Sequence, residues 1–168
     1  MILIAVGANL PAAGFDSPLA TCEAAVARID RDAALRVVGR SRWYESEPVP
    51  KSDQPWFING AVAIETDLNP EVLLARLHVI EDTFGRVRRV RNEARPLDLD
   101  IIDYNGLVRI GAIDPTLPHP RAHERAFVLL PIPGSESRLA ASGLGRGCPN
   151  PHCGSRYGRR CHPGALGA

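Results

Sequence analysis

Two stretches of this chain begin with a polar residue followed by proline, and this pairing restricts the fold more than any other feature. Ser17-Pro18 precedes an alanine-rich stretch up to Asp30, and Asn69-Pro70 precedes a stretch that ends at Gly85. Ser and Asn cap the first turn of a helix, and proline fits that turn because no N–H partner is needed there. Apolar residues follow at helical spacing: Leu19, Cys22, Val26 and Ile29 in the first stretch, and Leu73, Leu77, Ile80 and Phe84 in the second. The sequence therefore predicts two amphipathic helices.

The segments around these helices have the pattern of β-strands. We expect strands at residues 2–6, 35–44, 56–65 and 97–104, the last closed by the turn pair Asn105-Gly106. The order strand, helix, strand, strand, helix, strand predicts an α+β fold, a ferredoxin-like split βαβ sandwich with helices on an antiparallel sheet.

Charge and composition divide the chain in two. Residues 1–133 hold 15 basic and 18 acidic residues, whereas residues 134–168 hold five and one, together with three of the four cysteines and 8 of the 15 glycines. The second part lacks the apolar residues of a core. We predict one domain at 1–133 and an atypical tail at 134–168 that is disordered or results from a change of reading frame. A zinc site in the tail is an alternative, although the C-x4-C-x7-C spacing matches no strong zinc pattern.

Several classes of protein do not fit this composition. No apolar run approaches the roughly 18 residues that a membrane helix needs, so we expect a cytoplasmic protein. Lys51 is the only lysine and follows no glycine-rich phosphate loop, which excludes a P-loop kinase.

Asp98 and Asp100 flank Leu99 within the last predicted strand. Their carboxylates should leave the same face, about 7 Å apart at the Cα atoms. Two like charges on one strand face repel each other, and a divalent cation with oxygen ligands such as Mg²⁺ would offset that cost. Two alternatives remain: arginines of the preceding segment neutralise the pair, or the pair lies on a solvated edge.

The segment just upstream is rich in arginine. It holds Arg86, Arg88, Arg89, Arg91 and Arg95. Guanidinium groups bind phosphate oxygens in a bidentate manner, so a polyphosphate bridged by Mg²⁺ to the two aspartates is a consistent site. A solvated basic face, or an unspecific nucleic-acid patch, is the alternative.

Two further segments carry candidate ligands. Pro118-His119-Pro120 with Arg125 offers an imidazole and one more guanidinium, although a single histidine is often only structural. Phe57 and Asn59 share a strand face after a proline-rich loop, where a ring and an amide can hold a planar heteroaromatic molecule. The alternative is that Trp56 and Phe57 are core aromatics.

The ordered set of these segments resembles the 6-hydroxymethyl-7,8-dihydropterin pyrophosphokinase family over residues 1–133. The pieces that carry the resemblance are GANL at 7–10, YESEPV at 44–49, DQPWFIN at 53–59, GRVR at 85–88, RPLDLDI at 95–101 and LPHPRAHERAFVLLP at 117–131. The resemblance implies transfer of pyrophosphate from ATP to the pterin, with AMP as the second product, in folate biosynthesis. It also implies a monomer. The acidic net charge of residues 1–133 argues against a nucleic-acid partner, and the lack of a long apolar run argues against a membrane.

The resemblance also implies a role for individual residues. Asp98 and Asp100 would hold two Mg²⁺ ions, and with Arg86 and Arg95 they would form the catalytic set. The ATP site would consist of Arg86, Arg88, Arg95, Thr116, His119 and Arg125. The pterin site would consist of Ser46, Pro48, Val49, Phe57 and Asn59, with Phe57 stacked on the ring and Asn59 hydrogen-bonded to its edge.

Two other functions are weighed against this one. A single-stranded RNA-binding module can share the fold, but such modules carry exposed aromatics on the central strands and a basic net charge. Residues 1–133 have an acidic net charge. An inactive relative would bind nucleotide without turnover, and the unusual tail is the reason to consider it.

Overall fold

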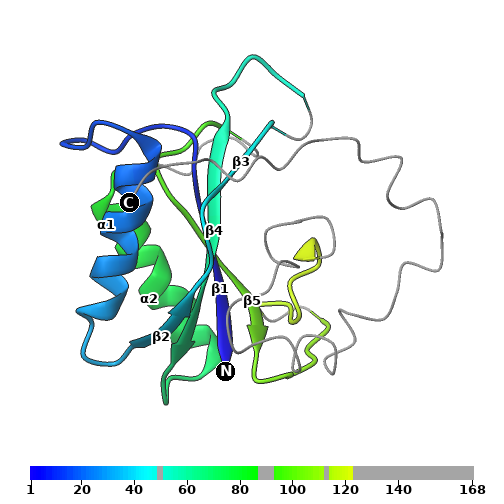
Figure 1. The fold of residues 1–168 in the computed structure, drawn as a ribbon. Coiled ribbons are helices and arrows are strands. Elements are labelled where there is room, and N and C mark those ends of the chain that lie inside the picture. The colour runs from blue at the N-terminus through cyan, green and yellow to red at the C-terminus, as the bar shows by residue number, and fades with distance from the viewer. Residues whose placement is uncertain (49–50, 87–92, 112–113, 123–168) are drawn as a thin grey trace.

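The computed structural model describes residues 1–48, 51–86, 93–111 and 114–122 of the chain (Figure 1). The elements are β1 (Ile2–Ala8), α1 (Pro18–Asp30), β2 (Arg36–Arg40), β3 (Tyr44–Ser46), β4 (Phe57–Glu65), α2 (Pro70–Thr83) and β5 (Asp98–Tyr104). Val49, Arg88, Arg125 and the predicted tail lie outside the described residues.

Both predicted helix starts are confirmed. The Ser17 side chain accepts a hydrogen bond from the N–H of Ala20 at 3.1 Å, and Asn69 accepts one from Val72 at 2.9 Å. Gly85 follows the second helix with a φ of +79°, a left-handed conformation that costs glycine little. The local capping signals therefore set where the helices begin and end.

The strands form one antiparallel sheet in the order β2-β4-β1-β5, and β3 also pairs with β4. Both helices lie on the same side of this sheet (Figure 1). The α+β ferredoxin-like fold is therefore confirmed. No helix in the described part of the chain is long and apolar enough to cross a membrane.

One strand prediction is wrong in its extent. Residues 35–44 form two strands instead of one, and both pair with β4. Between them, the Ser41 side chain accepts a hydrogen bond from the N–H of Ala61 at 2.9 Å. The ring of Trp43 lies over Gly60, where a Cβ atom would come within 2.6 Å of it. These contacts turn the chain at 41–43, and strand propensity alone does not show them.

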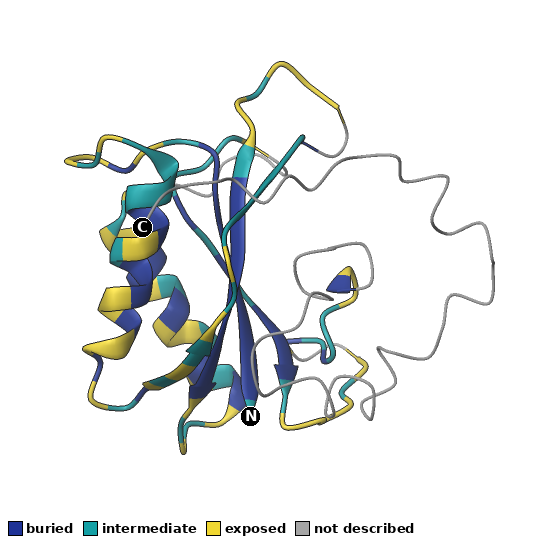
Figure 2. Ribbon diagram, viewed as in Figure 1, coloured by how far each residue is buried: buried dark blue, intermediate teal, exposed yellow. Residues whose placement is uncertain are grey.

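The sheet has one apolar face and one face of mixed character. The first face packs against the helices through a core that includes Ile4, Val6, Val62, Leu77 and Leu99. On the other face Leu3, Ala63 and Ile102 pack against Ala122 near one end of the central strands. The strands β1, β4 and β5 are mostly buried along their length (Figure 2). Polar side chains gather at the other end of the mixed face.

Candidate active site

The two aspartates of β5 lie on the sheet face opposite the helices. Asp98 pairs with Gly7 of β1 and Asp100 pairs with Ala5, while Leu99 between them is buried in the helix-side core. Their side chains are 18% and 28% exposed. The alternation predicted from the sequence is therefore confirmed, and two carboxylates remain accessible on one face.

Arginines surround Asp98. Arg86 donates from Nη1 to the Asp98 Oδ1 atom at 2.6 Å, and Arg95 donates from Nη1 to Oδ2 at 3.2 Å. The alternative in which upstream arginines neutralise the aspartates thus describes Asp98 in this structure. Burial opposes the charge of Arg86, but the carboxylates of Asp98 and Glu81 outweigh that effect and raise the pKa of Arg86 above its usual value. Arg86 is therefore a fixed positive charge in the site.

Glu81 also takes part in this network, although the resemblance matches it only weakly to a nucleotide-side position. It is a fully buried residue in the last turn of α2, and it pairs with Arg86. Its carboxylate also accepts a hydrogen bond from the Leu99 N–H at 2.7 Å. In the sequence it is visible only as a charged residue within the apolar stripe of α2, next to Ile80 and shortly before Gly85.

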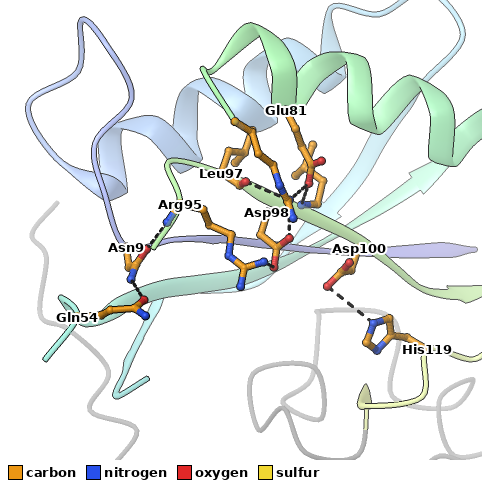
Figure 3. A network of polar contacts seen from close by, with 10 residues as sticks. Asn9, Gln54, Glu81, Arg95, Leu97, Asp98, Asp100 and His119 are labelled. Carbon is orange, nitrogen blue, oxygen red and sulfur yellow. Dashed lines mark hydrogen bonds and ion pairs between the residues drawn. The ribbon is translucent and has the colours of Figure 1, made fainter. Parts of the chain in front are cut away.

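No role was predicted for Asn9, which belongs to the GANL motif. It is almost fully buried, and its Nδ2 atom donates to the Gln54 side chain at 3.1 Å and to the Pro55 carbonyl at 3.3 Å. Its Oδ1 atom accepts from the Arg95 N–H at 2.8 Å. Figure 3 shows Asn9 between Gln54 and Arg95, with Asp98 close by. The loop before β4 and the segment before β5 are therefore joined through one side chain.

His119 stands next to the second aspartate. Its Nε2 atom is 3.9 Å from Asp100 Oδ2, and its backbone N–H donates to the Ile102 carbonyl at 2.9 Å (Figure 3). The Nδ1 atom accepts a hydrogen bond from the Arg121 N–H at 3.1 Å. Thr116, half-buried, lies on the same segment. One ring nitrogen of His119 is thus held by the backbone of Arg121, and the other faces Asp100.

The predicted ring-binding residues meet on the same sheet face. Asn59 of β4 pairs with Gly7 of β1. Its Nδ2 atom donates to the Ser46 hydroxyl at 2.8 Å. A Cβ atom on Gly7 would come within 2.9 Å of Asn59 Oδ1, so the glycine makes room for the amide. Pro48 is buried and Phe57 is half-buried.

The aromatics of this loop are not core residues. Trp56 is 49% exposed, and neither it nor Phe57 belongs to the buried clusters among the described residues. The alternative that both are core aromatics is therefore wrong for Trp56, and it receives no support for Phe57.

The aspartates fit Mg²⁺ as a ligand pair. Mg²⁺ takes oxygen ligands and is commonly held by one or two carboxylates together with substrate phosphates. The described residues contain no group of three or more His, Cys, Asp or Glu side chains that could hold a metal. A cation at Asp98 and Asp100 would therefore need oxygen ligands from elsewhere, as a bound polyphosphate provides.

Carboxylates that can hold a divalent cation, next to arginines, are the groups by which enzymes stabilise the charge on a transferring phosphoryl group. The model of the 7,8-dihydro-6-hydroxymethylpterin-pyrophosphokinase family matches residues 3–135, so the chain belongs to this family. Family membership makes it a pyrophosphokinase of folate biosynthesis.

Several relatives carry the name 2-amino-4-hydroxy-6-hydroxymethyldihydropteridine pyrophosphokinase. That of Methylorubrum extorquens is 42% identical over 108 residues, which cover 64% of this chain and 68% of the relative. That of Bacillus subtilis is 44% identical over 108 residues, covering 64% of each chain. That of Haemophilus influenzae is 38% identical over 130 residues, covering 77% of each chain. The family match over residues 3–135 spans the part of the chain that contains the site.

Proposed function

We propose that this chain transfers the pyrophosphoryl group of ATP to the hydroxymethyl oxygen of 6-hydroxymethyl-7,8-dihydropterin, with Mg²⁺, and releases AMP. The observation that carries the proposal is the register of β1. Gly7 lies opposite both Asp98 and Asn59, so the carboxylate and the amide stand on one face, on either side of a strand that carries no side chain there. A nucleotide held at β5 and a pterin held at β4 would be neighbours.

Different residues of the chain bind the metal, the nucleotide and the pterin. Asp98 and Asp100 hold Mg²⁺, which when bound would neutralise charge on the phosphates. Arg86 and Arg95 contribute fixed positive charge beside Asp98. Thr116 and His119, with Arg88 and Arg125 outside the described residues, complete the ATP site. Ser46 orients Asn59 for the pterin edge, Phe57 stacks on the ring, and Pro48 and Val49 line the loop.

The reaction follows from this placement. The hydroxymethyl oxygen attacks the β-phosphorus of ATP, and the bond from that phosphorus to the oxygen shared with the α-phosphorus breaks. Arginines that already point into the site need no reorganisation as charge develops on the transferring group, which is the main source of electrostatic catalysis. The carboxylates of Asp98 and Asp100 are acceptors for the hydroxyl proton.

The proposal extends to the rest of the chain. The catalytic domain spans residues 1–133, and the tail at 134–168 is separate from it. The protein acts as a cytoplasmic monomer without nucleic acid or membrane. An RNA-binding role is disfavoured because the mixed sheet face carries Asp98 and Asp100, which would repel a phosphate backbone.

The test is a chromatographic assay of AMP on the full-length chain, with ATP, the pterin and Mg²⁺ each left out in turn. Formation of AMP that requires all three is expected. A pterin with a methyl group in place of the hydroxymethyl group serves as the matched control, because it can bind but offers no nucleophile. ADP as the product would contradict pyrophosphoryl transfer. Nucleotide binding without AMP would instead identify an inactive relative.

A further inference from the structure

Glu81 is the one fully buried carboxylate among the described residues, and it contacts β5, the strand that carries Asp98 and Asp100. Burying a carboxylate is costly unless charged or polar partners surround it. Its partners include groups of two different kinds, the guanidinium of Arg86 and the N–H of Leu99. Leu99 stands between Asp98 and Asp100, so Glu81 contacts the backbone at the centre of the aspartate pair.

The Leu99 contact reflects the position of β5 at the edge of the sheet. β5 pairs with β1 on one side only, and an edge strand exposes N–H groups that require other partners. Glu81 supplies one for Leu99. The strand segment that carries both aspartates is thereby fixed to the end of α2.

The Arg86 contact concerns charge. The Nη1 atom of Arg86 contacts Glu81, the Leu97 carbonyl at 3.2 Å and Asp98 at 2.6 Å (Figure 3). Without Glu81, the positive charge of Arg86 would act mainly on Asp98 and would compete with any cation for that carboxylate. With Glu81, the charge of Arg86 is shared between two carboxylates, so more of the negative charge of Asp98 stays available to a cation, with Arg95 as its other basic partner.

We propose that Glu81 is a positioning residue that keeps Asp98 available for the divalent cation by balancing the charge of Arg86 and anchoring β5. This inference rests on the proposed function, because it concerns the cation site at Asp98 and Asp100. Mutation of a residue that contacts a metal ligand commonly lowers the affinity for the metal by about 10- to 100-fold. An effect of that size is expected for Glu81.

The test compares Glu81→Gln with the wild-type chain. Glutamine keeps the shape and an acceptor for Leu99 but removes the charge. The affinity of α,β-methylene-ATP, which cannot transfer its pyrophosphoryl group, is measured by calorimetry with EDTA and with saturating Mn²⁺. The ratio of the two affinities reports the contribution of the metal alone. We expect this ratio to fall about tenfold in Glu81→Gln.

Glu71→Gln is the matched control. Glu71 lies in the first turn of the same helix, whereas Glu81 lies in its last turn. It also forms an ion pair with an arginine, but with Arg109, at 2.7 Å, instead of Arg86. Its ratio should equal that of the wild-type chain. A purely structural role of Glu81 would weaken nucleotide binding equally with and without Mn²⁺, leaving the ratio unchanged, and that result would overturn the proposal.

A double variant covers the case in which Glu81→Gln folds poorly. Removing both members of a buried ion pair is often tolerated better than removing one. Glu81→Gln with Arg86→Met should show the same metal ratio as Arg86→Met alone, because the proposed effect of Glu81 on Asp98 acts through the charge of Arg86. A ratio that falls further in the double variant would contradict the charge-balancing role. If Mn²⁺ does not change the nucleotide affinity of the wild-type chain, Asp98 and Asp100 do not form a metal site. The proposed role of Glu81 is then also wrong.

Discussion

The Asn9 Oδ1 atom accepts a hydrogen bond from the backbone N–H of Arg95 at 2.8 Å, although 86 positions separate the two residues. The Asn9 backbone N–H in turn donates to the Arg95 carbonyl at 3.2 Å. Since the Arg95 side chain donates to Asp98, the end of β1 positions the phosphate side of the site. The same asparagine reaches Gln54 and Pro55 on the pterin side, so both halves depend on it.

Asn9→Ala should therefore destabilise the fold and weaken the reaction. It leaves buried polar partners unpaired, which costs about 1 to 3 kcal/mol of the free energy of unfolding. Urea denaturation measures this loss, and steady-state kinetics should show a lower kcat/KM. Gln54→Ala is the control, because it removes one partner and keeps the Arg95 contact, so its loss should be smaller. Wild-type stability in Asn9→Ala would show that these contacts contribute nothing.

Asp98→Asn and Asp100→Asn should each lower kcat by at least about a hundredfold. Mutating a residue that only contacts a metal ligand commonly costs about 10- to 100-fold, and loss of a ligand itself should cost more. Each variant removes a negative oxygen ligand while preserving the shape of the side chain. The AMP assay measures the loss, and excess Mg²⁺ should restore part of the activity. Asp82→Asn, an exposed site on α2, is the control and should retain full activity. Near-normal turnover in either β5 variant would exclude that carboxylate as a metal ligand.

Gly7→Ala and Gly60→Ala should have different effects although both glycines lie in central strands. The Gly7 methyl group would come within 2.9 Å of Asn59 Oδ1, so the KM for the pterin should rise while nucleotide affinity changes little. The Gly60 methyl group would meet the Trp43 ring on the helix side, where overpacking costs about 1 to 3 kcal/mol of stability. Kinetics and thermal unfolding separate the two effects. Equal changes in pterin KM would show that Gly7 does not make room for Asn59.

Asp32 and Asp103 should respond to pH in opposite directions. The hydrogen bond from Arg76 lowers the pKa of Asp32 despite the opposing effect of burial, so its contribution is present above its unfolded pKa and is lost as pH falls through the folded value. Burial raises the pKa of Asp103, so stability decreases as pH rises from its unfolded value through its folded value. At neutral pH, Asp32→Asn should cost about 1 kcal/mol, whereas Asp103→Asn should stabilise the chain.

Urea denaturation of both variants between pH 3 and pH 7 measures these changes. Asp32→Asn should reduce the loss of stability on acidification, and Asp103→Asn should remove the decline on the way to neutral pH. The two variants serve as controls for each other, because both replace a mostly buried aspartate by its amide. If both variants raise, or both lower, the free energy of unfolding at pH 7, the opposite pKa shifts of Asp32 and Asp103 are contradicted.

The elements of the fold could be predicted from the sequence because their signals are local. Ser17 and Asn69 cap helices within three residues of themselves, and the Asn105-Gly106 turn adopts positive φ at both residues. The single strand expected at 35–44 is the exception. Its break depends on contacts of Ser41 and Trp43 with β4, which are distant in the sequence.

The same division applies to the site. The period-two spacing of Asp98 and Asp100, and of Phe57 and Asn59, determined which face each pair occupies, because alternate residues of a strand point the same way. The sequence could not show that these pairs meet, since that depends on the register of β1 between β4 and β5. Nor could it show that Glu81 and Asn9 serve the site. Their roles consist of hydrogen bonds to segments distant along the chain, which only the packing of the helices and loops on the sheet creates.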